Sequence, residues 1–186
     1  AAPAVDAARV RALAAAGKRV RVDANRAWTT DKYAEFLEGL GDAVASLDFV
    51  EEPPFAKAGV PRAYDEALWD ARDEHGGWRD EFGAADALVL KPALLGLERC
   101  LNLAARHPRP VASSCFETGV GLAHLALLGA ALPADAQGLG TYAWLAEDPF
   151  GFAELVGADG LVDAATAERR LRAFAEKVLD RAAAAR

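Results

Sequence analysis

Short apolar runs alternate with longer helical patterns along this chain, and each run is followed by polar or glycine-rich sequence. Such alternation is typical of a parallel α/β sheet or barrel. We predict six strands, over residues 19–23, 47–51, 61–65, 88–91, 110–114 and 137–141. An α/β fold is therefore expected, in which helices join successive strands.

Apolar residues at helical spacing lie between the first two predicted strands. The positions i, i+3, i+4 and i+7 of this stripe are Tyr33, Phe36, Leu37 and Leu40. Thr30 precedes the stripe, and threonine is a residue type that caps helix N-termini. The segment is therefore predicted to form an amphipathic helix with Thr30 as its cap.

Two more helices are predicted near the ends of the chain. The first has an apolar stripe at Val10, Leu13 and Ala14 and ends at Gly17, since glycine commonly terminates helices. The stripe of the last helix consists of Leu171, Phe174 and Val178. The chain is thus expected to open on a helix and to close on one.

Composition narrows the class of protein. The 186 residues are 53% hydrophobic and no linker or internal repeat divides them, so residues 1–186 are predicted to form a single domain. A net charge of -7 argues against a general affinity for nucleic acid or for an anionic membrane. No stretch reaches the roughly 20 apolar residues of a membrane span. The two cysteines, Cys100 and Cys115, are predicted to be reduced and buried.

The first four predicted strands each end on an ionisable residue, in the order Asp23, Glu51, Asp65 and Lys91. In a β/α barrel the carboxyl ends of the strands converge on one mouth, where active sites form. Three converging carboxylates repel one another unless a cation lies among them, and oxygen ligands of this kind suit Mg²⁺. Each acid alone is explained better as a helix N-cap or a loop charge. Together, the three predict a metal site.

Two basic residues accompany these acids. Arg21 shares a face with Asp23, because side chains two positions apart in a strand point the same way. An arginine there pairs either with a metal-ligand carboxylate or with a substrate carboxylate, and the sequence leaves both roles open. Lys91 follows three apolar residues and precedes Pro92. Its ammonium is therefore expected to emerge from a buried strand, which favours a catalytic role.

Four segments resemble the third to sixth barrel strands of the enolase superfamily, in the same order. They are residues 22–28 (VDANRAW), 49–53 (FVEEP), 65–68 (DEAL) and 90–92 (LKP). Within the superfamily the chain resembles the o-succinylbenzoate synthases. Residues 113–122 and 138–148 are most similar to the plant and algal version, one module of a multifunctional phylloquinone-pathway protein. The resemblance implies a partial TIM-type (β/α) barrel, about strands 3 to 8, without the first strands and the N-terminal capping domain.

The resemblance also implies roles for individual residues. Asp23, Glu51 and Asp65 would bind Mg²⁺, with Glu51 rather than Glu52 as the ligand, and Lys91 would face the substrate as the catalytic lysine. The residues that would bind the substrate are Arg21, Asn25, Ser113, Ser114 and Gly138. The implied reaction is that of a lyase, the dehydration of a cyclohexadiene carboxylate to o-succinylbenzoate in menaquinone or phylloquinone biosynthesis.

Two departures from the family pattern have consequences. The family carries a Lys-x-Lys pair on its second strand, and the second lysine is the base. This chain begins after that point, so the isolated chain is predicted to be inactive. Only 14 positions separate Glu51 from Asp65, whereas a strand and a barrel helix need roughly 20 or more. The helix between them is therefore predicted to be cut short, and residues 73–82 are predicted to form a loop or an irregular helix.

Other functions remain open at this point. One is a muconate cycloisomerase or dipeptide epimerase on the same barrel, although residues 138–141 lack the aspartates with which such epimerases hold a dipeptide. Another is a non-catalytic fragment. The expected partners are a small carboxylate substrate and other modules of a larger polypeptide, not nucleic acid or membrane. The expected location is the cytoplasm in a bacterium or the plastid in a plant or alga.

Overall fold

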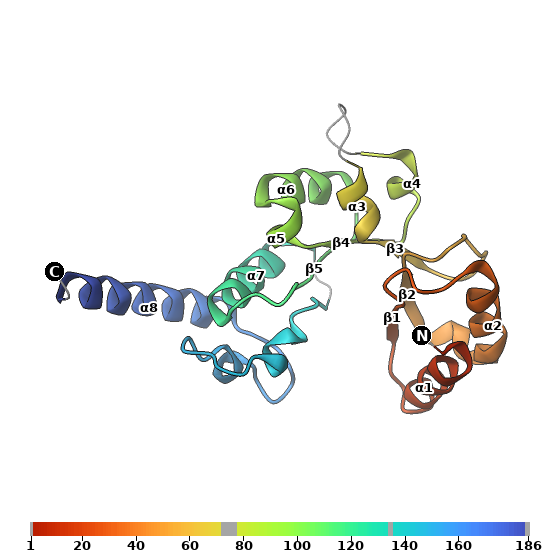
Figure 1. Cartoon of the computed structure of the whole chain (residues 1–186), viewed down its shortest axis with the longest axis horizontal. Coiled ribbons are helices and arrows are strands. Elements are labelled where there is room, and N and C mark those ends of the chain that lie inside the picture. Colours follow the sequence, from red (N-terminus) through yellow and green to blue (C-terminus); the bar gives the residue numbers. More distant parts are fainter. Residues whose placement is uncertain (1, 72–77, 134–135, 185–186) are drawn as a thin grey trace. The chain divides into compact units, whose positions relative to one another are not determined.

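The computed structural model describes residues 2–71, 78–133 and 136–184 (Figure 1). Its strands form a sheet of order β1-β2-β3-β4-β5. They are β1 (Val20–Asp23), β2 (Leu47–Glu51), β3 (Arg62–Tyr64), β4 (Ala87–Leu90) and β5 (Pro110–Ala112). The pairs β1–β2, β2–β3 and β3–β4 are parallel. This order, in which each strand adds beside the one before it, is that of a β/α barrel.

The chain divides into two compact units. The first comprises Ala1–Val89 and Ala105–Arg109, and the second comprises Leu90–Ala104 and Pro110–Arg186. The α-helices are α1 (Pro3–Ala15), α2 (Thr30–Leu40), α3 (Glu66–Asp70), α4 (Asp80–Gly83), α5 (Pro92–Leu95), α6 (Leu97–Arg106), α7 (Gly119–Ala131) and α8 (Ala164–Ala184). Three 3₁₀ helices are η1 (Gly41–Ser46), η2 (Gly140–Trp144) and η3 (Phe152–Leu155). Within the described ranges, no helix combines the length and apolarity needed to cross a membrane.

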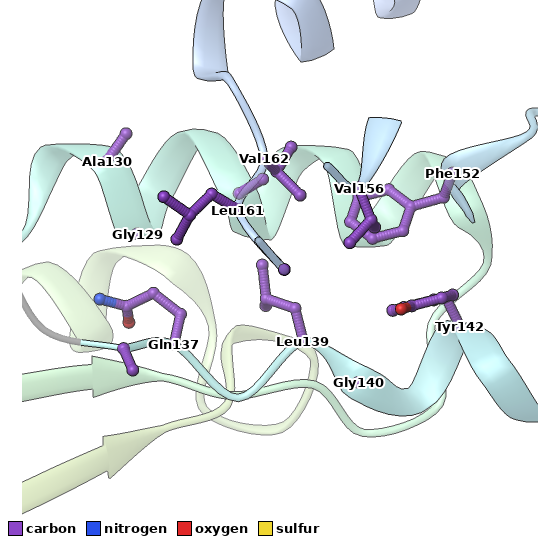
Figure 2. Close-up of a pocket in the computed structure, with 13 residues that line it drawn as sticks. Gly129, Ala130, Gln137, Leu139, Gly140, Tyr142, Phe152, Val156, Leu161 and Val162 are labelled. Carbon is purple, nitrogen blue, oxygen red and sulfur yellow. The ribbon is translucent and has the colours of Figure 1, made fainter. Parts of the chain in front are cut away.

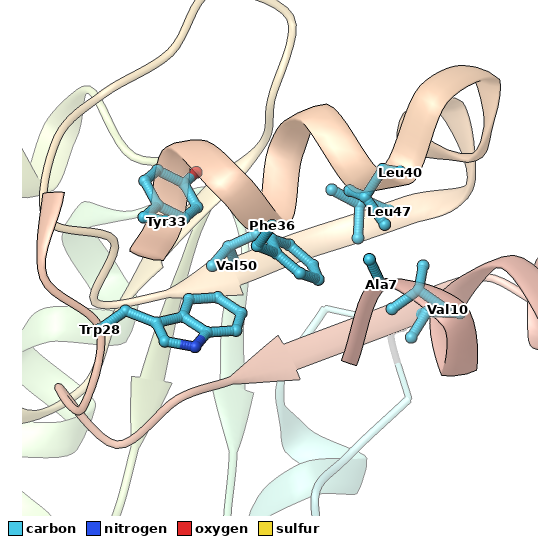
Figure 3. Close-up of a cluster of buried hydrophobic side chains, with 9 residues drawn as sticks. Ala7, Val10, Trp28, Tyr33, Phe36, Leu40, Leu47 and Val50 are labelled. Atoms are coloured by element: carbon cyan, nitrogen blue, oxygen red, sulfur yellow. The ribbon is translucent and has the colours of Figure 1, made fainter. Parts of the chain in front are cut away.

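The core of the first unit packs α1 and α2 against one face of β1 and β2 (Figure 3). It consists of Ala7, Val10, Val20, Trp28, Tyr33, Phe36, Leu40, Leu47 and Val50. The ring centroids of Trp28 and Phe36 lie 4.5 Å apart. Burial of each large side chain here contributes about 1.5–3 kcal/mol to the free energy of unfolding. A slip of one residue in either strand would move its apolar side chains to the other face, so this core favours the observed register. The other face of the strands carries Arg21, whose guanidinium lies 4.8 Å from the ring centre of Phe49.

The second unit is built around α7 and the start of α8. Its core consists of Leu122, Ala123, Leu125, Ala126, Phe150, Phe152, Leu155 and Ala167. A cavity of about 500 Å³ lies in this unit, lined by α7, the segment around Leu139 and the hairpin that joins Val156 to Val162 (Figure 2). The apolar face of α7 is thus covered by irregular chain as well as by α8.

Five of the six predicted strands are present, and their bounds differ from the predicted ones by at most two residues. The predicted strand 137–141 is wrong, because only Gly138 pairs, in an isolated parallel bridge to Ser113, before the chain turns into η2. Three residues that were predicted to end strands lie one or two positions beyond the observed strands β3, β4 and β5. They are Asp65, Lys91 and Ser114. Residues 52–61 contain no helix, which confirms the predicted shortening. Of the predicted loop 73–82, residues 73–77 lie outside the described residues, and α4 begins at Asp80.

Three details of the helices and thiols also differ from the predictions. The cap of α2 is Thr29, not Thr30, since Thr29 Oγ1 accepts the Lys32 N–H at 3.4 Å. Leu13 is 46% exposed and Val178 is 48% exposed, so neither of these two predicted stripe residues is buried. Cys100 is buried as expected, but Cys115 is only half-buried because it lies in the turn after β5.

Candidate metal centre

The carboxylates of Asp23, Glu51 and Asp65 converge at the carboxyl ends of three adjacent strands in the first unit. Asp23 pairs in register with Glu51, and Glu51 pairs with Ala63, two residues before Asp65. One carboxylate oxygen from each acid lies within 4.8 Å of those from the other two. Asp23 is exposed, Glu51 is half-buried and Asp65 is fully buried. The structure therefore brings the predicted trio together.

This cluster has the chemistry of a site for a hard divalent cation. On an octahedral Mg²⁺ with ligand distances of about 2.1 Å, cis oxygens lie about 3.0 Å apart and trans oxygens about 4.2 Å apart. Oxygens within 4.8 Å of one another reach that geometry through side-chain adjustments of at most about 2 Å. An all-oxygen donor set favours Mg²⁺ over zinc or copper, which prefer nitrogen and sulfur ligands. A cation would also relieve the repulsion among three neighbouring carboxylates. The three residues thus fit the metal that was predicted for them.

The simpler explanation, that the acids are helix caps, fails for Asp65. Asp65 directly precedes α3, yet its side chain accepts no capping hydrogen bond. The cap comes from Glu52, whose Oε1 accepts the backbone N–H groups of Asp65 at 2.8 Å and of Ala67 at 2.9 Å. Asp23 differs, because its Oδ1 accepts the Asn25 N–H at 2.6 Å and so also supports a local turn.

A cavity of about 370 Å³ opens beside Asp23. It is lined by residues of α1, of β1 and of the turn that follows β1, and both Arg21 and Asn25 face it. Two of the residues predicted to bind substrate therefore lie along one space that adjoins the acidic cluster.

Arg21 also has a partner that the sequence did not reveal. Its Nε donates to Asp48 Oδ2 at 2.8 Å, and Arg109 and Arg19 pair with the same carboxylate. Asp48 lies at a shift in the register of β1 and β2. Val20 pairs with Leu47, and the next residue, Arg21, pairs with Phe49. Burial would raise the pKa of Asp48, but hydrogen bonds from Arg21 and Arg109 outweigh burial and hold that pKa below its ordinary value. Substrate binding by Arg21 stays a prediction.

Left-handed backbone marks the turns that follow the strands. The non-glycine residues with positive φ among the described residues are Asn25, Arg26, Glu52 and Phe116, with φ between 47° and 62°. The first three follow β1 and β2, and Phe116 follows β5. Such conformations cost about 1–3 kcal/mol each and cluster at functional sites. The first three therefore lie at the same ends of β1 and β2 as the acidic cluster does.

Lys91 lies in the second unit, directly after β4. It is half-buried and occupies the N-cap position of α5, whose first residue is Pro92. Proline is favoured at a first helical position because its φ is already helical and its missing N–H is not needed there. The backbone at Lys91 is therefore fixed, and its catalytic role stays a prediction.

The structure brings Ser113, Ser114 and Gly138 together in the second unit. Gly138 O accepts hydrogen bonds from the N–H and the Oγ of Ser114, both at 2.9 Å. Ser114 Oγ in turn accepts from Thr141 Oγ1 at 2.9 Å. Sequence reasoning missed Thr141, whose hydroxyl orients that of Ser114. A substrate role for the group stays a prediction.

The sequence match decides the family. A profile of the family described as Enolase C-terminal domain-like matches residues 1–169. The chain belongs to this family. Its sequential parallel sheet agrees with that membership, which confirms the prediction of an enolase-type α/β fold and of part of a (β/α) barrel.

Two relatives of this enolase-type chain are named o-succinylbenzoate synthase. An o-succinylbenzoate synthase of Mycolicibacterium smegmatis is 37% identical over 156 residues, which are 77% of this chain and 48% of the relative. One of Mycobacterium ulcerans is 39% identical over 157 residues, 77% of this chain and 47% of the relative. The crystal structure of MenC from Desulfotalea psychrophila LSv54 is 26% identical, with a TM-score of 0.58 over 73% of this chain and 44% of that one. The chain thus spans about half the length of the curated relatives it matches.

Proposed function

We propose that this chain is the metal-binding part of an o-succinylbenzoate synthase, a Mg²⁺-dependent lyase of menaquinone biosynthesis. The convergence of Asp23, Glu51 and Asp65 carries this proposal, because it supplies an oxygen-ligand site at the ends of adjacent strands. The shared name of the curated relatives supports the choice of reaction. Those relatives are bacterial, which supports a cytoplasmic enzyme rather than a plastid one.

The proposed reaction removes water from a cyclohexadiene carboxylate after a proton leaves the carbon next to the carboxylate. Bound Mg²⁺ supplies positive charge where negative charge develops on the substrate. Asp23, Glu51 and Asp65 hold that cation. Lys91, which the family resemblance implies to be the lysine that faces the substrate, contributes a second positive charge. These residues stabilise charge but do not by themselves move the proton.

Other residues of the chain would hold the substrate. Arg21 and Asn25 face the cavity beside Asp23. Their side chains are donors that can bind the carboxylate of the substrate. Ser113 and Ser114 offer hydroxyl groups for the succinyl arm of the substrate, and Gly138, whose own N–H donates to Ala112 O at 2.8 Å, holds Ser114 in place. Ser114 Oγ is held on both sides, by Gly138 O and by Thr141. Such fixed polar groups orient a ligand without paying for reorganisation.

The test is an assay of o-succinylbenzoate formation by the absorbance of its aromatic ring. Proton removal needs a base within about 3 Å of the proton, and the resemblance assigns this role to the Lys-x-Lys pair. The 186-residue chain alone is therefore expected to show no turnover. The family resemblance implies that the part of the M. smegmatis relative that this chain does not match carries the Lys-x-Lys pair, so a fusion to that part is expected to restore turnover with Mg²⁺. Lys91→Ala in the fusion should abolish it.

The alternatives are separate outcomes of the same experiment. Turnover of a dipeptide or a muconate by the fusion, without dehydration, would replace the proposal by an epimerase or a cycloisomerase. Full activity of the chain alone would show that another residue here is the base. A fusion that folds and binds Mg²⁺ but transforms none of these substrates would indicate a non-catalytic protein.

A further inference from the structure

Glu52 follows the metal-ligand candidate Glu51 but points into a different environment. Its backbone is left-handed, with φ of 47°, which is uncommon for a residue with a long side chain. Its N–H donates to Ala63 O at 3.0 Å, so the turn is anchored to β3. The side chain is only 8% exposed. A strained backbone and a buried carboxylate at one position call for a compensating interaction.

That interaction is with the backbone of Asp65. Glu52 Oε1 accepts the N–H of Asp65 at 2.8 Å and the N–H of Ala67 at 2.9 Å. Hydrogen bonds from backbone N–H to an ionised carboxylate are among the strong ones in proteins. The N–H of Ala67 is at the second position of α3, which an N-cap aspartate commonly binds with its own side chain, so Glu52 occupies a group that Asp65 would otherwise cap.

The second oxygen of Glu52 is tied to the turn after β1. Oε2 accepts from Arg26 at 3.2 and 3.3 Å, and Arg26 also pairs with Asp70 at 2.8 Å. Arg26 is three residues beyond Asp23. A single carboxylate therefore bonds the β1 turn, the end of β2 and the start of α3, the three segments that carry the acidic cluster.

We propose that Glu52 is a positioning residue for the metal centre, acting through Asp65. By capping α3 in place of Asp65, Glu52 leaves the Asp65 carboxylate directed to Asp23 and Glu51. Without Glu52, the Asp65 side chain turns to cap its own helix and leaves the cluster. This inference rests on the proposed metal function of Asp23, Glu51 and Asp65.

The experiment measures Mn²⁺ affinity of the 186-residue chain by electron paramagnetic resonance of unbound Mn²⁺. Glu52→Ala is expected to weaken binding by 10–100-fold, the usual effect of losing a group that orients a metal ligand. Glu52→Gln is expected to stay within about threefold of wild type, because its amide oxygen accepts the same two N–H groups. Asp70→Asn is the matched control, since it breaks the Arg26 pair and leaves both hydrogen bonds to α3 intact.

A structural role alone predicts a different pattern. If Glu52 only supported folding, the loss of Mn²⁺ affinity in Glu52→Ala, Glu52→Gln and Asp70→Asn would follow their loss of stability in urea unfolding without metal. Positioning instead predicts that Glu52→Gln and Asp70→Asn lose stability through Arg26 but keep their Mn²⁺ affinity, unlike Glu52→Ala. If Glu52→Ala does not fold, Glu52→Asp replaces it. Glu52→Asp keeps the charge and loses reach, so positioning requires weaker Mn²⁺ binding by Glu52→Asp than by Glu52→Gln, and the reverse order would overturn the inference.

The outcome also separates this inference from the proposed function. If wild type shows no Mn²⁺ binding that Glu51→Gln removes, the metal centre itself is wrong. If wild type binds Mn²⁺ through Glu51 and Glu52→Ala binds it equally well, the metal centre stands and Glu52 has no positioning role.

Discussion

Arg109 Nη2 lies 2.8 Å from both carboxylate oxygens of Asp48, although 61 positions separate the two residues. The backbone N–H of Arg109 donates to Nδ1 of the buried His107, whose other ring nitrogen contacts Ala85 O at 3.2 Å. The guanidinium therefore extends from a fixed backbone. His107 precedes β5, at the amino ends of the strands, and so belongs to the part of the fold that supports stability rather than chemistry.

Asp48→Asn is expected to destabilise the chain by about 2 kcal/mol at pH 7. Loss of a fully buried ion pair costs about 3–5 kcal/mol, and the value here is lower because Arg19, one of the three arginines, is 70% exposed. The folded-state pKa of Asp48 lies below its ordinary value, so its contribution is present above the unfolded pKa of about 3.9 and is lost as pH falls through the folded pKa.

The measurement is urea unfolding at pH 7, 5 and 3. Wild type should lose more stability than Asp48→Asn between pH 5 and pH 3, because the variant has no carboxylate to protonate there. Glu38→Gln, at an exposed position on α2, is the control and should follow wild type. Equal acid sensitivity of wild type and Asp48→Asn would contradict the assignment.

Mg²⁺ is expected to stabilise the chain through the acidic cluster. A ligand at 100 times its dissociation constant adds about 2.7 kcal/mol to the free energy of unfolding. Asp23→Asn should abolish most of this gain, because the amide keeps the hydrogen bond from the Asn25 N–H but removes one ligand charge. Thermal melts with and without MgCl₂ test this, with exposed Asp31→Asn as the control. The same Mg²⁺-induced rise in Tm for Asp23→Asn and wild type would rule Asp23 out as a ligand.

The sequence pattern predicted the three acids of the metal centre but not the ion pairs of Asp48 with Arg21 and Arg109. Asp23, Glu51 and Asp65 were recognisable because each ends a short apolar run, and parallel strands place such ends together. Asp48 was not recognisable, because it lies inside an apolar run and only a register shift of one residue directs it to Arg21 and Arg109. Alternation along a strand does not reveal such a shift.

The ends of helices were harder to predict than their presence. Adjacent threonines offered two caps for α2, and the structure uses Thr29 rather than Thr30. The stripe of α8 was predicted to continue to Val178, but burial ends earlier, because Leu171 and Phe174 contact the core of the second unit and Val178 does not. Helical periodicity indicates which residues share a face, not how far the neighbouring core extends.

Gly138→Ala is expected to destabilise the second unit by about 1–3 kcal/mol, the usual cost of forcing a methyl group into a packed site. Its Cβ would lie 2.7 Å from Ser113 Oγ and 3.2 Å from Ser113 Cβ, so rotation of the hydroxyl alone does not relieve the clash. Gly140→Ala is the matched control, because nothing lies within 4 Å of its added Cβ. Unfolding in urea should show the loss for Gly138→Ala only, and equal stability of the two variants would contradict the close approach.

The two thiols are expected to differ in reactivity. Burial raises the pKa of Cys100 to about 11, and the thiolate is the reactive form, so Cys100 should not react while the chain is folded. Cys115 is half-buried in the turn after β5 and should be alkylated by iodoacetamide at pH 8. Mass spectrometry of peptides from native protein should show label on Cys115 alone, and protein unfolded in urea should show it on both. Labelling of Cys100 at a comparable rate in native protein would mean that α6 opens readily, contrary to the complete burial of that side chain.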